Sequence, residues 1–94
     1  MVTVNAIMKI NPEYRDSYLA LVEPLVIAAN KEEGALYYAH FERTDEPNTF
    51  AFIEQYRNEY ALEAHNESQH FQKFFAEVKQ YLLTEPVIKV LSSN

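Results

Sequence analysis

The stretch of sequence that decides the fold is EGALYYAHFERTDEPNTFAFIEQYRNEYALEAHNESQHFQKF, residues 33–74. Its first half holds two aromatic-rich runs, 35–44 and 49–56, which alternate with a period of two and are separated by the turn-forming residues 45–48. This alternation places successive side chains on opposite faces of a sheet. Bulky apolar groups occur in both alternating sets of residues 49–56, so the sequence predicts a hairpin inside a sheet that is covered on both sides.

The second half of the stretch has a helical pattern with a break in it. Asn58 can cap a helix that runs to about His65, and Ser68 can cap a second helix. The apolar face of that second helix consists of Phe71, Phe74, Phe75, Val78 and Leu82. In an unbroken helix His65 and His70 would point about 140° apart, whereas the break allows both to face one pocket.

The segment before this stretch predicts a strand followed by a helix. Residues 2–10 alternate between the two faces of a strand. Asn11 and Pro12 are residue types that begin helices, and the apolar spacing of three and four then continues to about Lys31. Pro24 lies inside that pattern, so we expect one helix with a kink rather than two helices.

The ends of the elements complete the topology. Gly34, the only glycine, follows the first helix, and we expect it to adopt the left-handed conformation that ends helices. Pro86 stops the last helix, and the β-branched run 87–91 predicts a final strand. With right-handed crossovers the order βαββαβ gives an α+β, ferredoxin-like fold, a four-stranded antiparallel sheet in the order 4-1-3-2 with both helices on one face. We expect residues 1–94 to form this single domain.

Composition restricts the possible partners. A domain of 94 residues buries little surface by itself, so an aromatic fraction of 14% predicts further burial in a homodimer. The chain has no cysteine for disulfides or thiolate sites, and a net charge of −6 disfavours nucleic acid and anionic lipid. No apolar run approaches the roughly 20 residues of a membrane span, and the N-terminus lacks a signal peptide pattern. We therefore expect a cytoplasmic protein that binds neither nucleic acid nor membranes.

The three histidines raise the question of a metal site. One hypothesis combines His40, His65 and His70 with an oxygen ligand from Glu54 or Glu42, since imidazole and carboxylate suit zinc or iron. No compact metal-binding motif is present, and we predict that the protein binds no metal. Considered singly, His65 suits the negative end of a helix dipole, and His70 suits a surface position in the first turn of a helix.

Two polar residues on predicted strands are further candidates. His40 shares a strand face with apolar residues and therefore needs a buried partner, for which Tyr38, Glu42 and Glu54 are the candidates. Asn5 alternates with the apolar residues of its strand. It is either an amide in a pocket or a satisfied polar group within the sheet.

The abundance of aromatic residues suits a planar aromatic ligand, although an aromatic stripe is also a common core feature. Seven tyrosines and six phenylalanines occur in the chain. Dinucleotide and phosphate loops need several glycines, so bound nicotinamide, flavin and nucleotide triphosphate are disfavoured. The serines lie at helix starts or near the end of the chain, which argues against a serine hydrolase.

Four short motifs carry a family resemblance. They are Glu33-Gly34 before Leu36-x-Tyr38, Ile53-Glu54-Gln55-Tyr56, Ala61-Leu62-x-Ala64-His65, and Ser68-x-His70-Phe71. With these motifs, nearly the whole chain resembles the antibiotic biosynthesis monooxygenase domain family. The resemblance implies a dimeric α+β barrel, in which the bare faces of two sheets pack together and each subunit has a pocket between its sheet and its helices.

The same resemblance implies an activity. Several members of the family oxidise small quinols or polycyclic phenols with O₂ and no metal, flavin or haem, because the deprotonated phenol itself can reduce oxygen. The protein then has to remove a proton, hold the anion and exclude water. The resemblance assigns His65 or His70 as the base, with Tyr38 and Asn5 as hydrogen-bond donors to the substrate. The substrate-binding residues that it implies are His40, Phe50, Phe52, Glu54 and Phe71.

Other members of the family imply other activities. Relatives that degrade haem have an Asn that Asn5 matches, but their Trp and ligating His are replaced by His65 and Phe75, which argues against haem degradation. Relatives that isomerise a small phosphorylated signalling sugar derivative need cationic groups for the phosphate. The few such groups near the expected pocket are Lys9, Arg43 and Arg57. A non-catalytic, ligand-binding dimer is a third alternative, since fold does not fix function.

Overall fold

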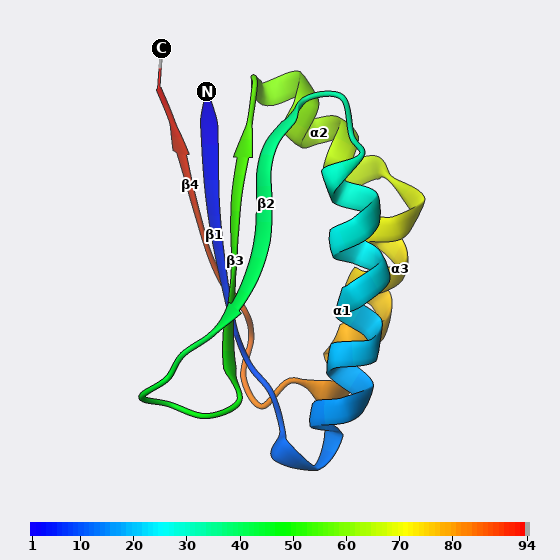
Figure 1. Ribbon diagram of the computed structural model, residues 1–94, viewed down its shortest axis with the longest axis vertical. Coiled ribbons are helices and arrows are strands. Elements are labelled where there is room, and N and C mark those ends of the chain that lie inside the picture. Colours follow the sequence, from blue (N-terminus) through cyan, green and yellow to red (C-terminus); the bar gives the residue numbers. More distant parts are fainter. Residues whose placement is uncertain (94) are drawn as a thin grey trace.

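The computed structural model describes residues 1–93 and contains one sheet with all of its helices on the same face (Figure 1). In chain order the elements are β1 (Val2–Lys9), η1 (Pro12–Tyr14), α1 (Arg15–Asn30), β2 (Ala35–Glu42), β3 (Thr49–Tyr56), α2 (Glu59–Glu67), α3 (Gln69–Val78), η2 (Lys79–Tyr81) and β4 (Val87–Ser92). The sheet is antiparallel with the order β2-β3-β1-β4, which confirms the predicted ferredoxin-like α+β fold. The predicted domain also includes Asn94, which lies outside the described residues.

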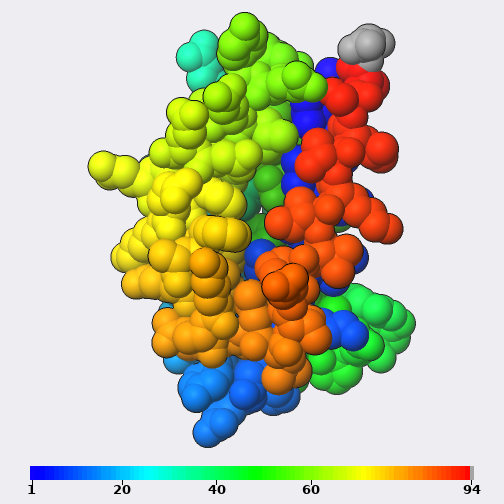
Figure 2. All heavy atoms as spheres, turned by 180° about the vertical axis from the view of Figure 1, so that it is seen from behind, coloured from blue at the N-terminus to red at the C-terminus, as the bar shows by residue number. Residues whose placement is uncertain are grey.

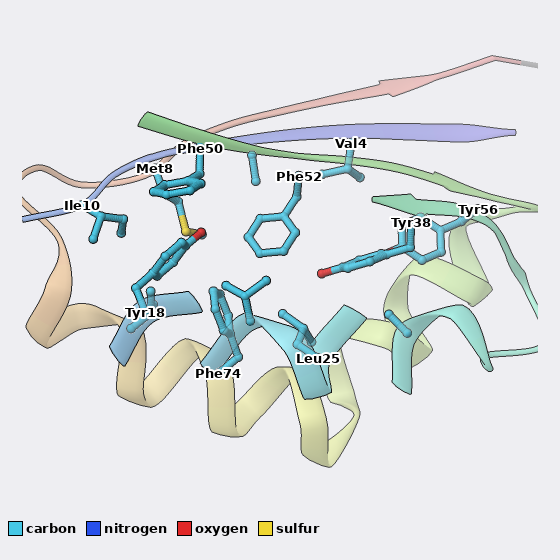
Figure 3. Packing of buried hydrophobic residues seen from close by; sticks show 14 of the residues in the cluster. Val4, Met8, Ile10, Tyr18, Leu25, Tyr38, Phe50, Phe52, Tyr56 and Phe74 are labelled. Carbon is cyan, nitrogen blue, oxygen red and sulfur yellow. The ribbon is translucent and has the colours of Figure 1, made fainter. Parts of the chain in front are cut away.

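The alternation of the strands separates a buried face from an open face. In β1 the buried residues are Val2, Val4, Ala6 and Met8, and in β3 they include Phe50, Phe52, Glu54 and Tyr56. These side chains point toward the helices, where Figure 3 shows Phe50 and Phe52 packed over Tyr18 and Phe74. The core therefore fills the layer between the sheet and the helices.

Figure 1 shows that one face of the sheet has no helix over it, and the strand pairing places large, exposed apolar side chains on this face. They come from all strands except β3 and are between 38% and 71% exposed. These residues are Ile7, Tyr37, Phe41, Val87 and Leu91. We call this set the open-face patch.

Helix α1 runs as one element through Pro24, as the sequence predicts. The side chain of Asn11 accepts a hydrogen bond from the backbone of Glu13, and one turn of 3₁₀ helix precedes the α-helix. The buried residues have the spacing of an amphipathic helix, namely Tyr18, Val22, Leu25 and Ala29. No helix within residues 1–93 combines the length and apolar character needed to cross a bilayer.

Gly34 differs from its predicted conformation. No glycine in residues 1–93 has a positive φ, so the expected left-handed helix end is wrong. The glycine is instead required by space, because a Cβ at this position would lie 2.3 Å from the Cβ of Ala61 in α2. The absence of a side chain at Gly34 lets α2 approach the start of β2.

Candidate functional site

A cavity of about 280 Å³ lies between the sheet and the helices α2 and α3, beside β4. Figure 2 shows the hollow between the yellow atoms of α3 and the red atoms of β4. Aromatic side chains supply much of its wall, among them Phe52, Phe71, Phe74 and Phe75. The polar groups in its lining come from Tyr38, Glu54 and Asn66. Such a cavity suits a flat apolar molecule with one or two polar substituents.

Glu54 is the ionisable carboxyl group at this cavity and is only 6% exposed. Burial raises the pKa of Glu54 to about 7, although a hydrogen bond from the Tyr56 hydroxyl to its Oε1, 2.5 Å long, acts in the opposite direction. Burial also raises the pKa of Tyr38, so that its hydroxyl stays protonated. Figure 3 shows this hydroxyl pointing into the layer between sheet and helices. The cavity therefore contains two polar groups of different kinds. One is a carboxyl group that titrates near neutral pH, and the other is a phenolic hydrogen-bond donor.

His65 lies directly behind Glu54 at the end of α2 and is 1% exposed. Its Nδ1 is 2.7 Å from Oε2 of Glu32, and its Nε2 is 4.0 Å from Oε1 of Glu54. Burial lowers the pKa of His65, so the ring is neutral, and the Glu32 carboxylate can only accept the Nδ1 proton. This leaves a lone pair on Nε2, an atom with no hydrogen-bond partner among residues 1–93. A carboxylate that orients an imidazole with a free nitrogen is an arrangement suited to a general base.

His70 joins the same cluster from the first turn of α3. Its Nε2 lies 2.5 Å from the Glu32 oxygen that also binds His65. The predicted break between the helices makes this possible, because the Ser68 hydroxyl donates to the carbonyl of His65 and accepts from the amide of Phe71. The expectation of a plain surface histidine is therefore wrong for His70. Glu32 was absent from the predicted site, since no short spacing connects it to either histidine.

His40 lies in a different part of the core. Its Nε2 is 2.8 Å from the Tyr18 hydroxyl, and its ring stacks on Phe50. The predicted partners Tyr38, Glu42 and Glu54 are wrong, because Tyr18 reaches His40 from α1. Glu42 instead forms a two-pronged ion pair with Arg15. The structure therefore does not assemble the hypothetical metal site of three histidines.

Two other predicted site residues also lie away from the cavity. Phe50 packs against Tyr18 with 4.9 Å between the ring centroids and belongs to the core near His40. Asn5 pairs with Ile53 and Lys89 on the helix-free face, because β1 turns Val4 and Ala6 toward the helices instead. The expectation that Asn5 donates a hydrogen bond into the cavity of its own chain is not met.

The cationic side chains proposed for phosphate binding are engaged elsewhere. Lys9 lies 3.9 Å from Glu46, and Arg43 lies 2.7 Å from Asp45. Arg57 donates to the backbone carbonyl of Glu33. Within residues 1–93 neither lysine nor arginine lines the cavity. The cavity therefore offers no cation to a phosphate group.

Comparison with known proteins agrees with this architecture. The chain is 39% identical over 87 residues to the protein named "Putative monooxygenase YcnE" of Bacillus subtilis (strain 168), which covers 93% of this chain and 90% of the relative. It is 33% identical over 76 residues to "Putative monooxygenase Rv0793" of Mycobacterium tuberculosis, which covers 81% and 73%. The solved structure of Rv0793 superposes with a TM-score of 0.93 at 27% identity and covers 99% of this chain and 94% of that chain.

A second structure gives the same result. The crystal structure described as an antibiotic biosynthesis monooxygenase superposes with a TM-score of 0.93 at 26% identity, covering 100% of this chain and 99% of that chain. The family model "Antibiotic biosynthesis monooxygenase" matches residues 1–77. The match includes Glu32, His65 and His70, and it confirms the resemblance inferred from the motifs. The chain belongs to the antibiotic biosynthesis monooxygenase family.

Proposed function

We propose that this protein uses O₂ to oxidise a small quinol or polycyclic phenol in the cavity beside Glu54, without a bound cofactor. The family and the names of its relatives support a monooxygenase-like activity. The observation that carries the more specific proposal is a mostly apolar cavity with several aromatic side chains that ends at Glu54, with the free Nε2 of His65 directly behind it.

The first step in this proposal is removal of the phenolic proton. Glu54 reaches the cavity, so its carboxylate takes the proton from the substrate, and the protonated carboxyl group then donates a hydrogen bond to the free Nε2 of His65. The gap of 4.0 Å between the two groups has to shorten by about 1 Å for a direct hydrogen bond, a change common when a substrate binds. The Tyr38 hydroxyl donates to the resulting phenolate oxygen. Glu32 positions His65 by holding its Nδ1 proton.

The second step is oxidation of the phenolate by O₂. One electron passes from the anion to O₂, and the phenoxyl radical then combines with superoxide at a ring carbon. Loss of water from the peroxide that forms gives a quinone, so that one oxygen atom enters the product and the other leaves as water. The apolar walls exclude solvent, which keeps the anion reactive and the radical pair together.

The test is O₂ consumption by the purified full chain with 1-naphthol or a menadiol-type quinol. We expect turnover above the rate without protein, and ¹⁸O₂ should place one labelled atom in the naphthoquinone product. Glu54→Gln should lower kcat by about 10²-fold or more, the typical contribution of a general base. Glu23→Gln, the same change on the exposed side of α1, is the matched control and should keep the wild-type rate.

Two results would contradict the proposal. One is a rate equal to the blank for every quinol and phenol tested, and the other is an unchanged kcat in both Glu54→Gln and His65→Asn. Thermal stabilisation by a quinol without any turnover would favour the non-catalytic, ligand-binding alternative.

We also propose that two copies of the chain form a homodimer through the open-face patch. Five large, exposed apolar side chains gather on one face of the sheet, and apolar patches of this kind commonly mark protein interaction surfaces. Figure 1 shows the helices on one side of the sheet, and the patch lies on the other side, so pairing would leave the cavity of each subunit away from the interface. The dimer then supplies stability that a chain of 94 residues gains poorly by itself.

A further inference from the structure

The cluster formed by Glu32, His65 and His70 brings together three potential metal ligands from three segments. Glu32 follows α1, His65 ends α2, and His70 begins α3. The Glu32 oxygen and the facing nitrogen of each histidine all lie within 4.8 Å of one another. Ser68 holds the backbone of the break between the helices on both sides, and this break brings His65 and His70 to the same carboxylate.

The three groups match the preferences of a divalent transition metal ion. Two imidazoles and one carboxylate are a common ligand set for Zn²⁺, with water in the fourth position. In a tetrahedral site with bonds of about 2.1 Å, the ligand atoms lie about 3.4 Å apart. The present separations of 2.5 and 2.7 Å from the Glu32 oxygen therefore have to widen by less than about 1 Å.

Access and charge also favour a cation. The side chains of His70 and Glu32 are 28% and 18% exposed, so the outer side of the cluster meets solvent while His65 lies inside. A small hollow between α1 and α3 reaches His70, and a second one beside Gly34 reaches Glu32. The net charge of −6 attracts cations to the protein.

We propose that Glu32, His65 and His70 bind one divalent transition metal ion, and that binding reverses the tautomer of His65. A metal on Nδ1 takes the lone pair there, so the single proton of the neutral ring moves to Nε2. That N–H then faces the Glu54 carboxyl oxygen 4.0 Å away and gives the unpartnered nitrogen a hydrogen-bond acceptor. No proton is gained or lost by His65 in this exchange.

Reversal of the His65 tautomer would also affect the proposed oxidation. This inference rests on the proposed function. Once Nε2 carries the ring proton, it faces Glu54 as a donor and can no longer accept a hydrogen bond from the protonated Glu54 carboxyl group. The metal-bound form should therefore be inactive, and the cluster would couple metal supply to activity. Metal binding itself does not depend on the proposed reaction.

The test is titration of untagged, EDTA-treated full chain with ZnCl₂ by calorimetry, with thermal unfolding as a second readout. We expect one ion per chain and a rise in Tm. Both His70→Ala and Glu32→Gln should weaken the Kd by about tenfold or more. Glu33→Gln, which changes the neighbouring carboxylate outside the cluster, and His40→Gln, which removes a histidine outside it, should bind Zn²⁺ like the wild type.

The tautomer is read by ¹⁵N NMR of the histidine rings, with and without Zn²⁺. The expected result is a proton on Nδ1 of His65 in the free protein and on Nε2 after Zn²⁺ is added. Absence of saturable Zn²⁺ binding, or wild-type affinity in the folded His70→Ala and Glu32→Gln variants, would overturn the site. An unchanged His65 tautomer would overturn the coupling alone, and a protein that binds Zn²⁺ but oxidises no phenol would refute only the proposed function.

Discussion

The Tyr18 hydroxyl lies 2.8 Å from Nε2 of His40, and this contact gives the partly buried ring a hydrogen-bond partner. His40 packs on Phe50 and Phe52, and burial lowers its pKa to about 4, while the nearby Glu42 carboxylate opposes the shift. A neutral Nε2 accepts the Tyr18 proton, whereas a protonated ring has no acceptor there. Protonation of His40 is therefore unfavourable as long as the ring stays packed in the folded protein.

The lowered pKa of His40 predicts that the folded protein loses stability in acid. The unfolded chain binds a proton at this residue once the pH falls below about 6.5, whereas the folded chain does so only near pH 4, so stability falls through that window and is unaffected above it. In His40→Gln the amide oxygen can still accept a hydrogen bond from the Tyr18 hydroxyl, but the side chain does not bind a proton in this pH range. Between pH 7.5 and 4.5 the wild type should lose about 2 kcal/mol more than the variant, measured by urea unfolding. Equal losses in both proteins would disprove this account.

The position of Ser68 between α2 and α3 predicts that its replacement weakens the helix break, and with it the candidate metal cluster. Its hydroxyl caps α3 and binds the end of α2, so Ser68→Ala should cost about 1 kcal/mol of stability. Ser68→Asp, which keeps a cap acceptor, should lose less. Ser17→Ala, the same change at an exposed position inside α1, should leave the urea midpoint unchanged or raise it slightly. A midpoint in Ser68→Ala equal to that of Ser17→Ala would show that the cap is dispensable.

The close approach of Gly34 and Ala61 predicts that substitutions at these two positions are strongly coupled in their effects on stability. A methyl group at Gly34 collides with the Ala61 side chain, so Gly34→Ala should destabilise the fold by about 1–3 kcal/mol, the usual cost of overpacking. The double variant Gly34→Ala with Ala61→Gly removes the collision and should recover much of that loss beyond what Ala61→Gly alone explains. Urea unfolding of all four proteins gives the coupling free energy. Additive costs would show that the close approach is not the reason for the glycine.

The open-face patch predicts a dimer that one charge can disrupt. Phe41 is 49% exposed on β2, and Phe41→Lys would place an ammonium group in the proposed interface. Sedimentation velocity at micromolar concentration should show a dimer for the wild type and a monomer for the variant. Tyr60→Lys changes an 83% exposed aromatic residue on α2 and should remain dimeric. A wild-type monomer, or a dimer that Phe41→Lys leaves intact, would contradict the proposed interface.

The fold was largely predictable because its signals are local. Alternation of apolar residues identified the strands, and capping residues such as Asn58 and Ser68 marked both helix starts correctly. The break that they define also explains why His65 and His70 meet. Each of these signals depends on neighbours within a few residues along the chain.

The site was less predictable because it depends on how the ends of elements meet. Glu32 is 33 residues from His65, and Tyr18 is 22 residues from His40, so no local pattern connects either pair. Alternation separated Asn5 from the apolar residues of its strand, but it did not show that the helices cover only the apolar side. Gly34 follows a helix in the sequence, which predicts a helix end, whereas its role depends on Ala61 in a later helix.

Strand β4 forms one wall of the cavity, yet it is the least secured element of the sheet. It pairs with β1 alone, and all six of its residues are exposed. Detaching it therefore costs less free energy than global unfolding, and the detachment opens the cavity along the length that Ile88 and Val90 close. We therefore expect β4 to fray before the rest of the sheet, which would widen the entrance of the cavity for a flat molecule while β1, β2 and β3 stay paired.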